Sequence, residues 1–208
     1  MDMVALHADD ALLVLEKPAG LLSVPGRGAE KQDCLASRAR RQWPDALVVH
    51  RLDMATSGLM LFARGAAMQR SLSAAFEKRA IHKRYVAVVH GLMAAQSGRI
   101  DAPLAADWPN RPRQQVDHER GKPSLSCWRV LQLDSMLHRT RVELEPVTGR
   151  SHQLRVHLAS IGHAIVGDDL YAGPQAATAP RLLLHASRLE FIHPGTGALV
   201  ELESPPPF

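Results

Sequence analysis

The alternation of hydrophobic and polar positions along the chain predicts a protein built mainly from short strands. Arg139 to Glu145 alternates at every residue, so Thr140, Val142 and Leu144 are expected on the buried face of one strand. Apolar or β-branched runs that end at turn residues predict further strands. These runs lie at Leu12 to Glu16, Leu47 to Val49, Leu59 to Phe62, Lys83 to His90, Leu182 to Leu184 and Leu199 to Leu202.

Three segments have the spacing of apolar residues that is typical of helices. The first, Asp33 to Gln42, places Leu35 and Ala39 on one face, and Asp33 is its expected N-cap. The others are Ala66 to Arg79 and Ser151 to Ile161, the latter ended by Gly162.

Strands outnumber helices, and short connections join most of them. This favours an α+β fold with a mainly antiparallel mixed β-sheet and flanking helices and loops. The length of 208 residues suits one domain. The longest polar segment, Pro103 to Ser124, is of a length that usually marks a functional or a disordered loop.

The composition is ordinary for a soluble globular protein, with a small excess of basic over acidic residues. Hydrophobic residues make up 46% and charged residues 22% of the 208, with a net charge of +4, which is compatible with an RNA partner. Two unpaired cysteines, Cys34 and Cys127, fit a reducing cytosol. Met1 to Val4 do not begin a leader, and no apolar stretch approaches the ~20 residues of a membrane span. A cytoplasmic protein without a membrane partner is expected.

One polar loop, Arg51 to Gly58, lies between two predicted buried strands and carries the carboxylate of Asp53. A side chain held in this way at the edge of a sheet is rigidly placed for chemistry. By the pattern alone, Asp53 could equally cap a turn, with Arg51 a surface charge.

The same loop carries the second of four ordered motifs that resemble the RluA-type pseudouridine synthases. His50-Arg51-Leu52-Asp53 followed by Thr56-Ser57-Gly58 is similar to the catalytic motif of that family. The other three motifs are Lys17-Pro18-Ala19-Gly20-Leu21, Lys83-Arg84-Tyr85-Val86-Ala87 and Thr148-Gly149-Arg150-Ser151-His152-Gln153-Leu154-Arg155. The resemblance covers roughly residues 6 to 203. It implies that residues 1–208 form a single catalytic domain, with the catalytic cleft on the sheet.

Three smaller segments resemble those family members that modify both 23S ribosomal RNA and tRNA. They are Ser23 to Arg27, Asp107 to Pro112 and Gly121 to Pro123. The resemblance implies an RNA isomerase that converts specific uridines, in 23S rRNA and in the tRNA anticodon stem-loop, and needs no cofactor or metal. The first motif begins within twenty residues of the start, so no N-terminal S4-type RNA-binding domain is expected.

The resemblance also implies roles for individual residues. Asp53 is the catalytic carboxylate, Arg150 its partner, and Tyr85 packs against the uracil. Arg51 fills the space left by a flipped base. Further cations are candidates for contacts with RNA phosphates: Lys83, Arg84, Arg111, Arg113 and Lys122, and also Arg38, Arg40, Arg41, Lys78 and Arg79.

Other functions remain open from the residues themselves. Asp53, Asp101, Asp168 and Asp169 could form a Mg²⁺ cluster of a nuclease, although they are far apart in sequence. A non-catalytic RNA-binding module would explain the basic patches and leave Asp53 without a role. A synthase for only one of the two RNAs is a further alternative. A monomer with no DNA partner is expected.

Overall fold

A computed structural model describes residues 5–208, which form two compact units. The first contains residues up to Lys83 and the segment from His185 to Pro207, and the second contains Arg84 to Leu184 with Phe208. The expectation about a leader concerns Met1 to Val4, which lie outside the described residues. A single catalytic domain without an S4-type domain stays a prediction.

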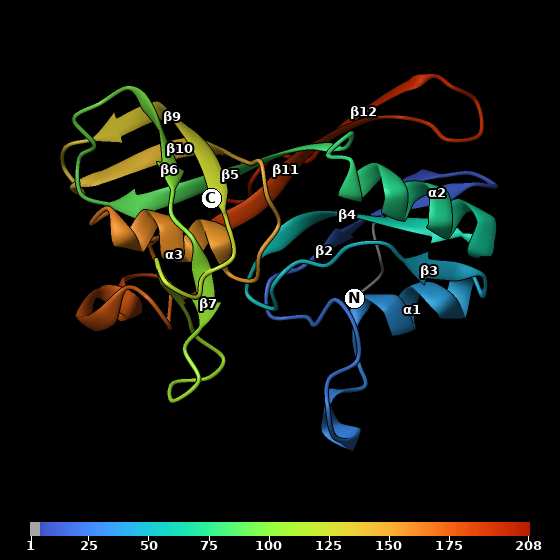
Figure 1. Ribbon diagram of the computed structural model, residues 1–208, viewed down its shortest axis with the longest axis horizontal. Coiled ribbons are helices and arrows are strands. Elements are labelled where there is room, and N and C mark those ends of the chain that lie inside the picture. Colours follow the sequence, from blue (N-terminus) through green and yellow to red (C-terminus); the bar gives the residue numbers. More distant parts are fainter. Residues whose placement is uncertain (1–4) are drawn as a thin grey trace. The chain divides into compact units, whose positions relative to one another are not determined.

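The first unit is a sheet with two α-helices beside it (Figure 1). Its strands in sheet order are β1 (Ala5–Ala8), β2 (Leu12–Lys17), β4 (Ser57–Arg64) and β11 (Leu184–Ile192), with β3 (Ala46–Val48) on β4 and β12 (Leu199–Glu203) on β11. The pairing of β4 with β11 is parallel, and the others are antiparallel. α1 (Leu35–Gln42) and α2 (Gly65–Glu77) flank β3 and β4, and Ala29–Lys31 form a 3-10 turn.

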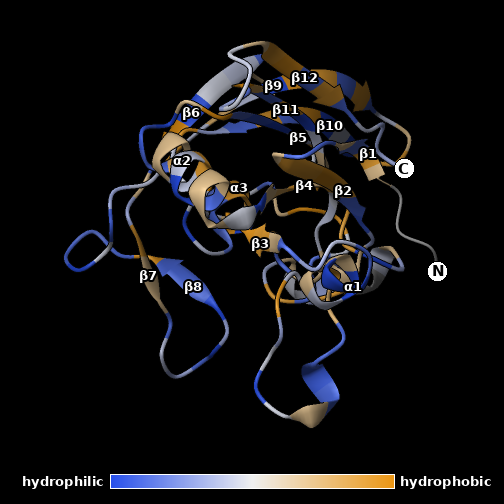
Figure 2. Ribbon diagram, turned by 90° about the vertical axis from the view of Figure 1, so that its right-hand side faces the viewer, coloured by the Kyte–Doolittle hydropathy of each residue, from blue (hydrophilic) through white to orange (hydrophobic). Residues whose placement is uncertain are grey.

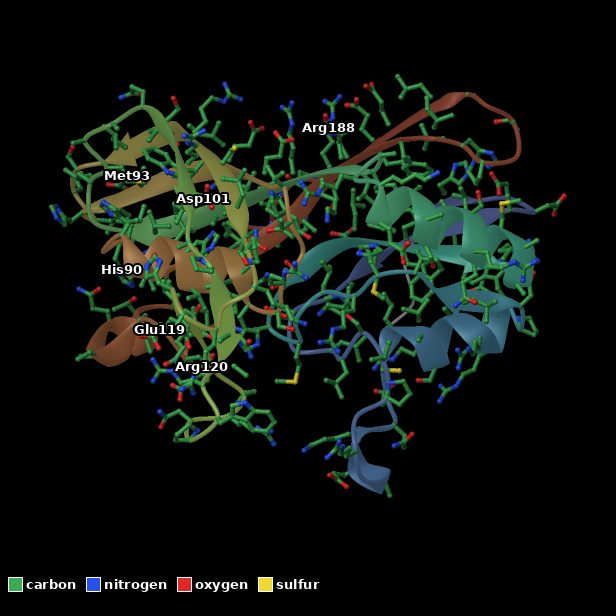
Figure 3. All side chains as sticks on the ribbon, viewed as in Figure 1. His90, Met93, Asp101, Glu119, Arg120 and Arg188 are labelled. Carbon is green, nitrogen blue, oxygen red and sulfur yellow. The ribbon has the colours of Figure 1, made fainter. Side chains whose placement is uncertain are left out.

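The centre of this unit is buried on both faces of the sheet. Val14 and Leu15 of β2 point to opposite faces, as do Met60 and Leu61 of β4, and all four side chains are inaccessible to solvent. Leu72 of α2 packs on one of these faces. The β11–β12 hairpin is held by ion pairs from Arg188, labelled in Figure 3, to Glu190, Glu201 and Glu203.

The second unit is antiparallel. Its sheet has the order β5 (His82–His90), β10 (Arg139–Pro146), β9 (Leu125–Asp134) and β6 (Ser97–Asp101). β7 (Leu104–Ala106) and β8 (Gln114–Val116) form a separate two-stranded hairpin, and α3 (Gln153–Ser160) is buried along nearly its whole length. A 3-10 segment, Gly173–Thr178, follows.

These elements confirm the α+β fold and most of the predicted segments. In β10, Thr140, Val142 and Leu144 are buried and their neighbours are not, as the alternation predicts. The expected cap at Asp33 is wrong. The N-cap is Cys34, whose sulfur accepts the Ser37 backbone N–H, while the Asp33 carboxylate instead accepts two hydrogen bonds from Arg38. The polar segment Pro103 to Ser124 is not one loop, because it contains β7 and β8.

Candidate active site

The loop that carries Asp53 is held by a buried serine. The Ser23 hydroxyl donates to the Leu52 carbonyl at 2.6 Å and accepts the Leu52 N–H at 3.0 Å. On the other side of the aspartate, the Thr56 N–H donates to the Asp53 carbonyl at 3.1 Å. Asp53 itself is half-buried. Its backbone is therefore fixed from both sides, which suits a residue that must present a carboxylate in one orientation.

A buried lysine also supports this loop. Lys17 is inaccessible to solvent, and its ammonium donates to the carbonyls of Pro18, Leu21 and Met54 at 2.9, 2.7 and 2.9 Å. A buried cation requires such acceptors. The contact to Met54 joins the first motif to the residue directly after Asp53. A lysine at the end of an apolar strand is only a weak sign of this role in a sequence.

The loop enters β4 at Ser57, where a chain of buried polar groups begins. The Ser57 hydroxyl lies 2.8 Å from Nδ1 of His185, and Nε2 of His185 lies 3.0 Å from the Ser204 hydroxyl. Ser204 donates onward to Glu16 at 2.8 Å. These bonds connect the end of the Asp53 loop to the neighbouring parallel strand and to the C-terminal segment. Sequence reasoning did not find them, because the bonds of Ser57 to His185 and of Ser204 to Glu16 join positions more than a hundred residues apart.

The side chain of His50, the first residue of the motif, is held by contacts with β4 and α2. Its Nε2 accepts the Leu61 backbone N–H at 2.8 Å, and its ring lies 4.7 Å from that of Phe76. An imidazole that accepts through Nε2 must be unprotonated at that nitrogen. Burial, with a smaller contribution from nearby Lys83, lowers the pKa of His50 to about 3. His50 is thus neutral at physiological pH.

We expect the His50 ring to show no protonation above pH 5 in a histidine NMR titration. Since its pKa in the folded protein is about 3 and the ordinary value is 6.5, the unfolded state binds more protons between these values. The contribution of His50 to the free energy of unfolding is therefore fully present above pH 6.5. It falls as the pH decreases from 6.5 to about 3, by about 1.4 kcal/mol per pH unit. A midpoint near 6 for the His50 resonance would contradict this environment.

In the second unit, Gln153 fixes the turn that carries Arg150. Its side-chain oxygen accepts the Arg150 N–H at 3.0 Å and the Thr148 hydroxyl at 2.7 Å. Its amide donates at 2.9 Å to the Leu125 carbonyl and at 2.9 Å to the Ser126 hydroxyl. All four hydrogen-bonding positions of this buried amide are used, so the turn is rigid while the Arg150 side chain itself is exposed. The motif contained Gln153, but its partners could not be known from sequence.

The other predicted site residues lie in different surroundings. Tyr85 is half-buried on β5, opposite Leu144 of β10. Lys83 has its ammonium 5.5 Å from the Phe76 ring centre, and burial lowers its pKa. Arg84 pairs with Glu143 at 3.5 Å. The remaining cations are exposed: Arg51, Arg111, Arg113 and Lys122. Asp53 belongs to the first unit, and Tyr85 and Arg150 to the second.

Two of the aspartates considered for a Mg²⁺ cluster, Asp168 and Asp169, instead contact Arg155. Asp168 is fully buried and receives two hydrogen bonds from Arg155 at 2.7 and 2.8 Å. Asp169 also contacts Arg155, at 3.2 Å. Within residues 5–208, no three side chains of the types His, Cys, Asp and Glu are grouped so that they could hold a metal ion. No helix in the same range is long and apolar enough to span a bilayer.

The sequence model of the RNA pseudouridylate synthase family matches residues 11–160, and the chain belongs to this family. It is 47% identical over 207 residues to the dual-specificity RNA pseudouridine synthase RluA of Escherichia coli strain K12, covering 99% of this chain and 94% of the relative. A protein of the same name from Vibrio cholerae is 50% identical over 190 residues, which are 91% of this chain and 77% of the relative.

Solved structures show the same fold. Human RNA pseudouridylate synthase domain containing 1 superposes with a TM-score of 0.83 at 27% identity, covering 100% of this chain and 84% of the human one. Human RNA pseudouridylate synthase domain containing 4 gives 0.77 at 26% identity, with 98% and 88% covered. The resemblance found in the motifs is confirmed. The chain is an RNA pseudouridine synthase, an isomerase acting on RNA.

Proposed function

We propose that this enzyme isomerises uridines in two RNAs, 23S ribosomal RNA and the anticodon stem-loop of tRNA. The observation that carries the proposal is identity of 47% over 99% of the chain to relatives named as dual-specificity synthases. The three segments around Ser23, Trp108 and Lys122 support it, because they resemble enzymes with both substrates. The enzyme works as a monomer in the cytoplasm, and DNA is not its partner.

The reaction defines what the site must do. The bond between uracil N1 and ribose C1′ breaks, the uracil turns, and a bond forms between C5 and C1′. C5 loses a proton and N1 gains one, so the product is an isomer of the substrate. No electron acceptor and no water enters the balance. The enzyme must therefore activate C1′ or the base, hold the uracil while it turns, and remove the C5 proton.

Asp53 is the proposed catalytic carboxylate. It can attack C1′, attack C6 of the uracil, or take a ribose proton to give a glycal, and these three routes remain alternatives. Its fixed backbone, held through Leu52 by Ser23 and through Met54 by Lys17, supports a role that depends on orientation. Arg150 is its proposed charge partner, and the turn of Arg150 is held by Gln153.

Tyr85 and Arg51 are proposed to handle the base. A uridine inside a stem-loop must leave its stack before it can react. Tyr85 packs against the flipped uracil and takes part in removal of the C5 proton, and Arg51 fills the space left behind. Of the proposed phosphate contacts, the exposed Arg111, Arg113 and Lys122 are better placed than Lys83, which is half-buried and whose pKa burial lowers.

Dual specificity is tested by kcat/KM on a minimal rRNA hairpin and on a tRNA anticodon stem-loop, at several salt concentrations. Both RNAs should be converted by the wild type. Arg111→Ala with Arg113→Ala should weaken both substrates alike, by ~1–3 kcal/mol, and should flatten the dependence on salt. Turnover of one RNA alone would refute the dual assignment and leave a synthase for a single RNA.

Activity should survive a large excess of EDTA. The isomerisation needs no Lewis acid or redox group, and the substrate can be folded in monovalent salt beforehand. The measurement is tritium release from a transcript labelled at uridine C5, with and without EDTA. The folded state of the RNA is checked in parallel by native gel. Loss of activity that Mg²⁺ or Zn²⁺ restores, on RNA shown to be folded, would contradict a metal-free mechanism.

A further inference from the structure

The hairpin formed by β7 and β8 ends in a turn with a defined shape. Asp107 and Arg113 close the turn through an N–H to carbonyl bond of 3.0 Å. Within it, Asn110 donates its backbone N–H to the Asp107 carbonyl at 3.1 Å, and its side-chain amide contacts both Asp107 carboxylate oxygens at 3.1 and 3.0 Å. These hydrogen bonds fix the backbone of the turn, so a side chain on it is held in a defined position.

The turn carries a tryptophan that the fold does not bury. Trp108 is 68% exposed, and the guanidinium carbon of Arg111 lies 3.2 Å from the centre of its ring. This is a stacked cation–π arrangement on one ring face. Because Arg111 covers that face, most of the exposed area belongs to the opposite face and the edge. An indole in this position adds little to the core and offers a flat, rigid apolar surface to a ligand.

The charges around the turn favour a nucleic acid over an apolar protein surface. The segment Pro103 to Lys122 carries four cations and three carboxylates. Two of the carboxylates are engaged locally, Asp107 by Asn110 and Asp117 by backbone N–H groups of Glu119 and Arg120. Glu119 and Arg120 lie on the turn that follows β8 (Figure 3), and the loops of this hairpin are largely hydrophilic (Figure 2). A flat aromatic face among arginines matches a base with its phosphate.

The hairpin is attached to the segment that bears Arg150. The first residue of β8, Gln114, donates its N–H to the Tyr171 hydroxyl at 2.8 Å. That hydroxyl lies 2.7 Å from Nδ1 of His152, the N-cap of α3 and the second residue after Arg150. Within the second unit, two hydrogen bonds thus connect the Trp108 hairpin to the Arg150 turn. RNA held at Trp108 would be held relative to that turn.

We propose that Trp108 is a stacking site for an unpaired base of the substrate stem-loop, with Arg111 holding the opposite face of the indole. The inference rests on the proposed RNA substrates and adds a recognition element to them. Stacking is tolerant of base identity, since every base has a flat face. A site of this kind accepts two different loops provided that each offers one unstacked base.

The test compares Trp108→Ala with Trp108→Phe in binding and turnover of the rRNA hairpin and the tRNA stem-loop. Loss of the aromatic ring should raise Kd and KM about tenfold for both RNAs, with kcat nearly unchanged. Phenylalanine should restore most of the affinity. Because no charge is removed, the slope of affinity against salt should equal that of the wild type, whereas Arg113→Ala should reduce it.

Two further arms make the result specific. Replacing the stacked loop nucleotide by an abasic residue should weaken the wild type and leave Trp108→Ala unchanged. Tryptophan fluorescence should fall on RNA binding in the wild type and much less in Trp108→Phe, which retains Trp43 and Trp128. Wild-type affinity in Trp108→Ala, or a loss that vanishes at high salt, would overturn the stacking site. Binding without turnover of either RNA would instead contradict the proposed substrates, and the stacking result would still be readable.

Discussion

Asp53→Asn should fold normally, bind RNA and form no pseudouridine. Asparagine keeps the size of the side chain, and the backbone bonds at Leu52 and Thr56 that hold the loop do not depend on the carboxylate. The charge and nucleophilicity of the carboxylate are lost, whichever of the three routes it follows. The rate should fall on the order of 10⁴-fold or more, the scale at which removal of a catalytic carboxylate acts.

The measurement is tritium release from a stem-loop labelled at uridine C5, together with Kd for the same RNA and a thermal melt. Asp10→Asn is a suitable control, because the Asp10 side chain is fully exposed and lies 3.7 Å from Arg64 at the surface. It should retain full activity. An Asp53→Asn enzyme that still turns over would remove Asp53 from the chemistry, and one that fails to fold would give it a structural role instead.

Gly58→Ala should be strongly destabilising. Gly58 has a φ of +110°, and a Cβ added there would lie 2.3 Å from the Ala186 carbonyl oxygen of the neighbouring strand. The parallel pairing of β4 with β11 places Gly58 opposite Ala186, so neither backbone can move without breaking the pairing. Backbone strain and overlap should together cost about 2–6 kcal/mol, a large part of the stability of an ordinary domain.

Gly65→Ala separates these two causes. Gly65 also has a positive φ, +77°, but an added Cβ meets no atom within 4 Å. The free energy of unfolding of Gly65→Ala should fall by about 1–2 kcal/mol, because only the strain of the left-handed backbone remains. Urea unfolding of the two variants and the wild type gives the comparison. Equal losses in both would mean that the close approach of β11 to Gly58 is not what makes glycine necessary there.

The periodic elements of this fold could be predicted because their patterns are local. Alternation at Arg139 to Glu145 and helical spacing at Ala66 to Arg79 each correspond to an observed element. The short strands β7 and β8 were missed because three residues carry too little periodicity. The cap of α1 was misplaced by one residue, since Asp33 finds a partner in Arg38 that competes with capping.

In the candidate site, too, the features that could be predicted are local in the sequence, and those that could not depend on the fold. Asp53 could be proposed as the catalytic carboxylate because the motif around it is contiguous in the sequence. The residues that hold it could not, because Lys17 and Ser23 act on backbone groups that the fold, and not the sequence, brings near. Gln153 and His185 are similar cases. Trp108 could be seen as part of a polar segment, but its exposure and its stacking on Arg111 are known only from the structure.

The central claim is that this chain isomerises uridine in RNA through Asp53. It is tested most directly by mapping pseudouridine in total RNA from cells that lack the gene and carry on a plasmid the wild type, Asp53→Asn or no insert. The account predicts that specific pseudouridines in 23S rRNA and tRNA are absent without the gene, return with the wild type and stay absent with Asp53→Asn. An unchanged pseudouridine map in cells without the gene, or full restoration by Asp53→Asn, would contradict it.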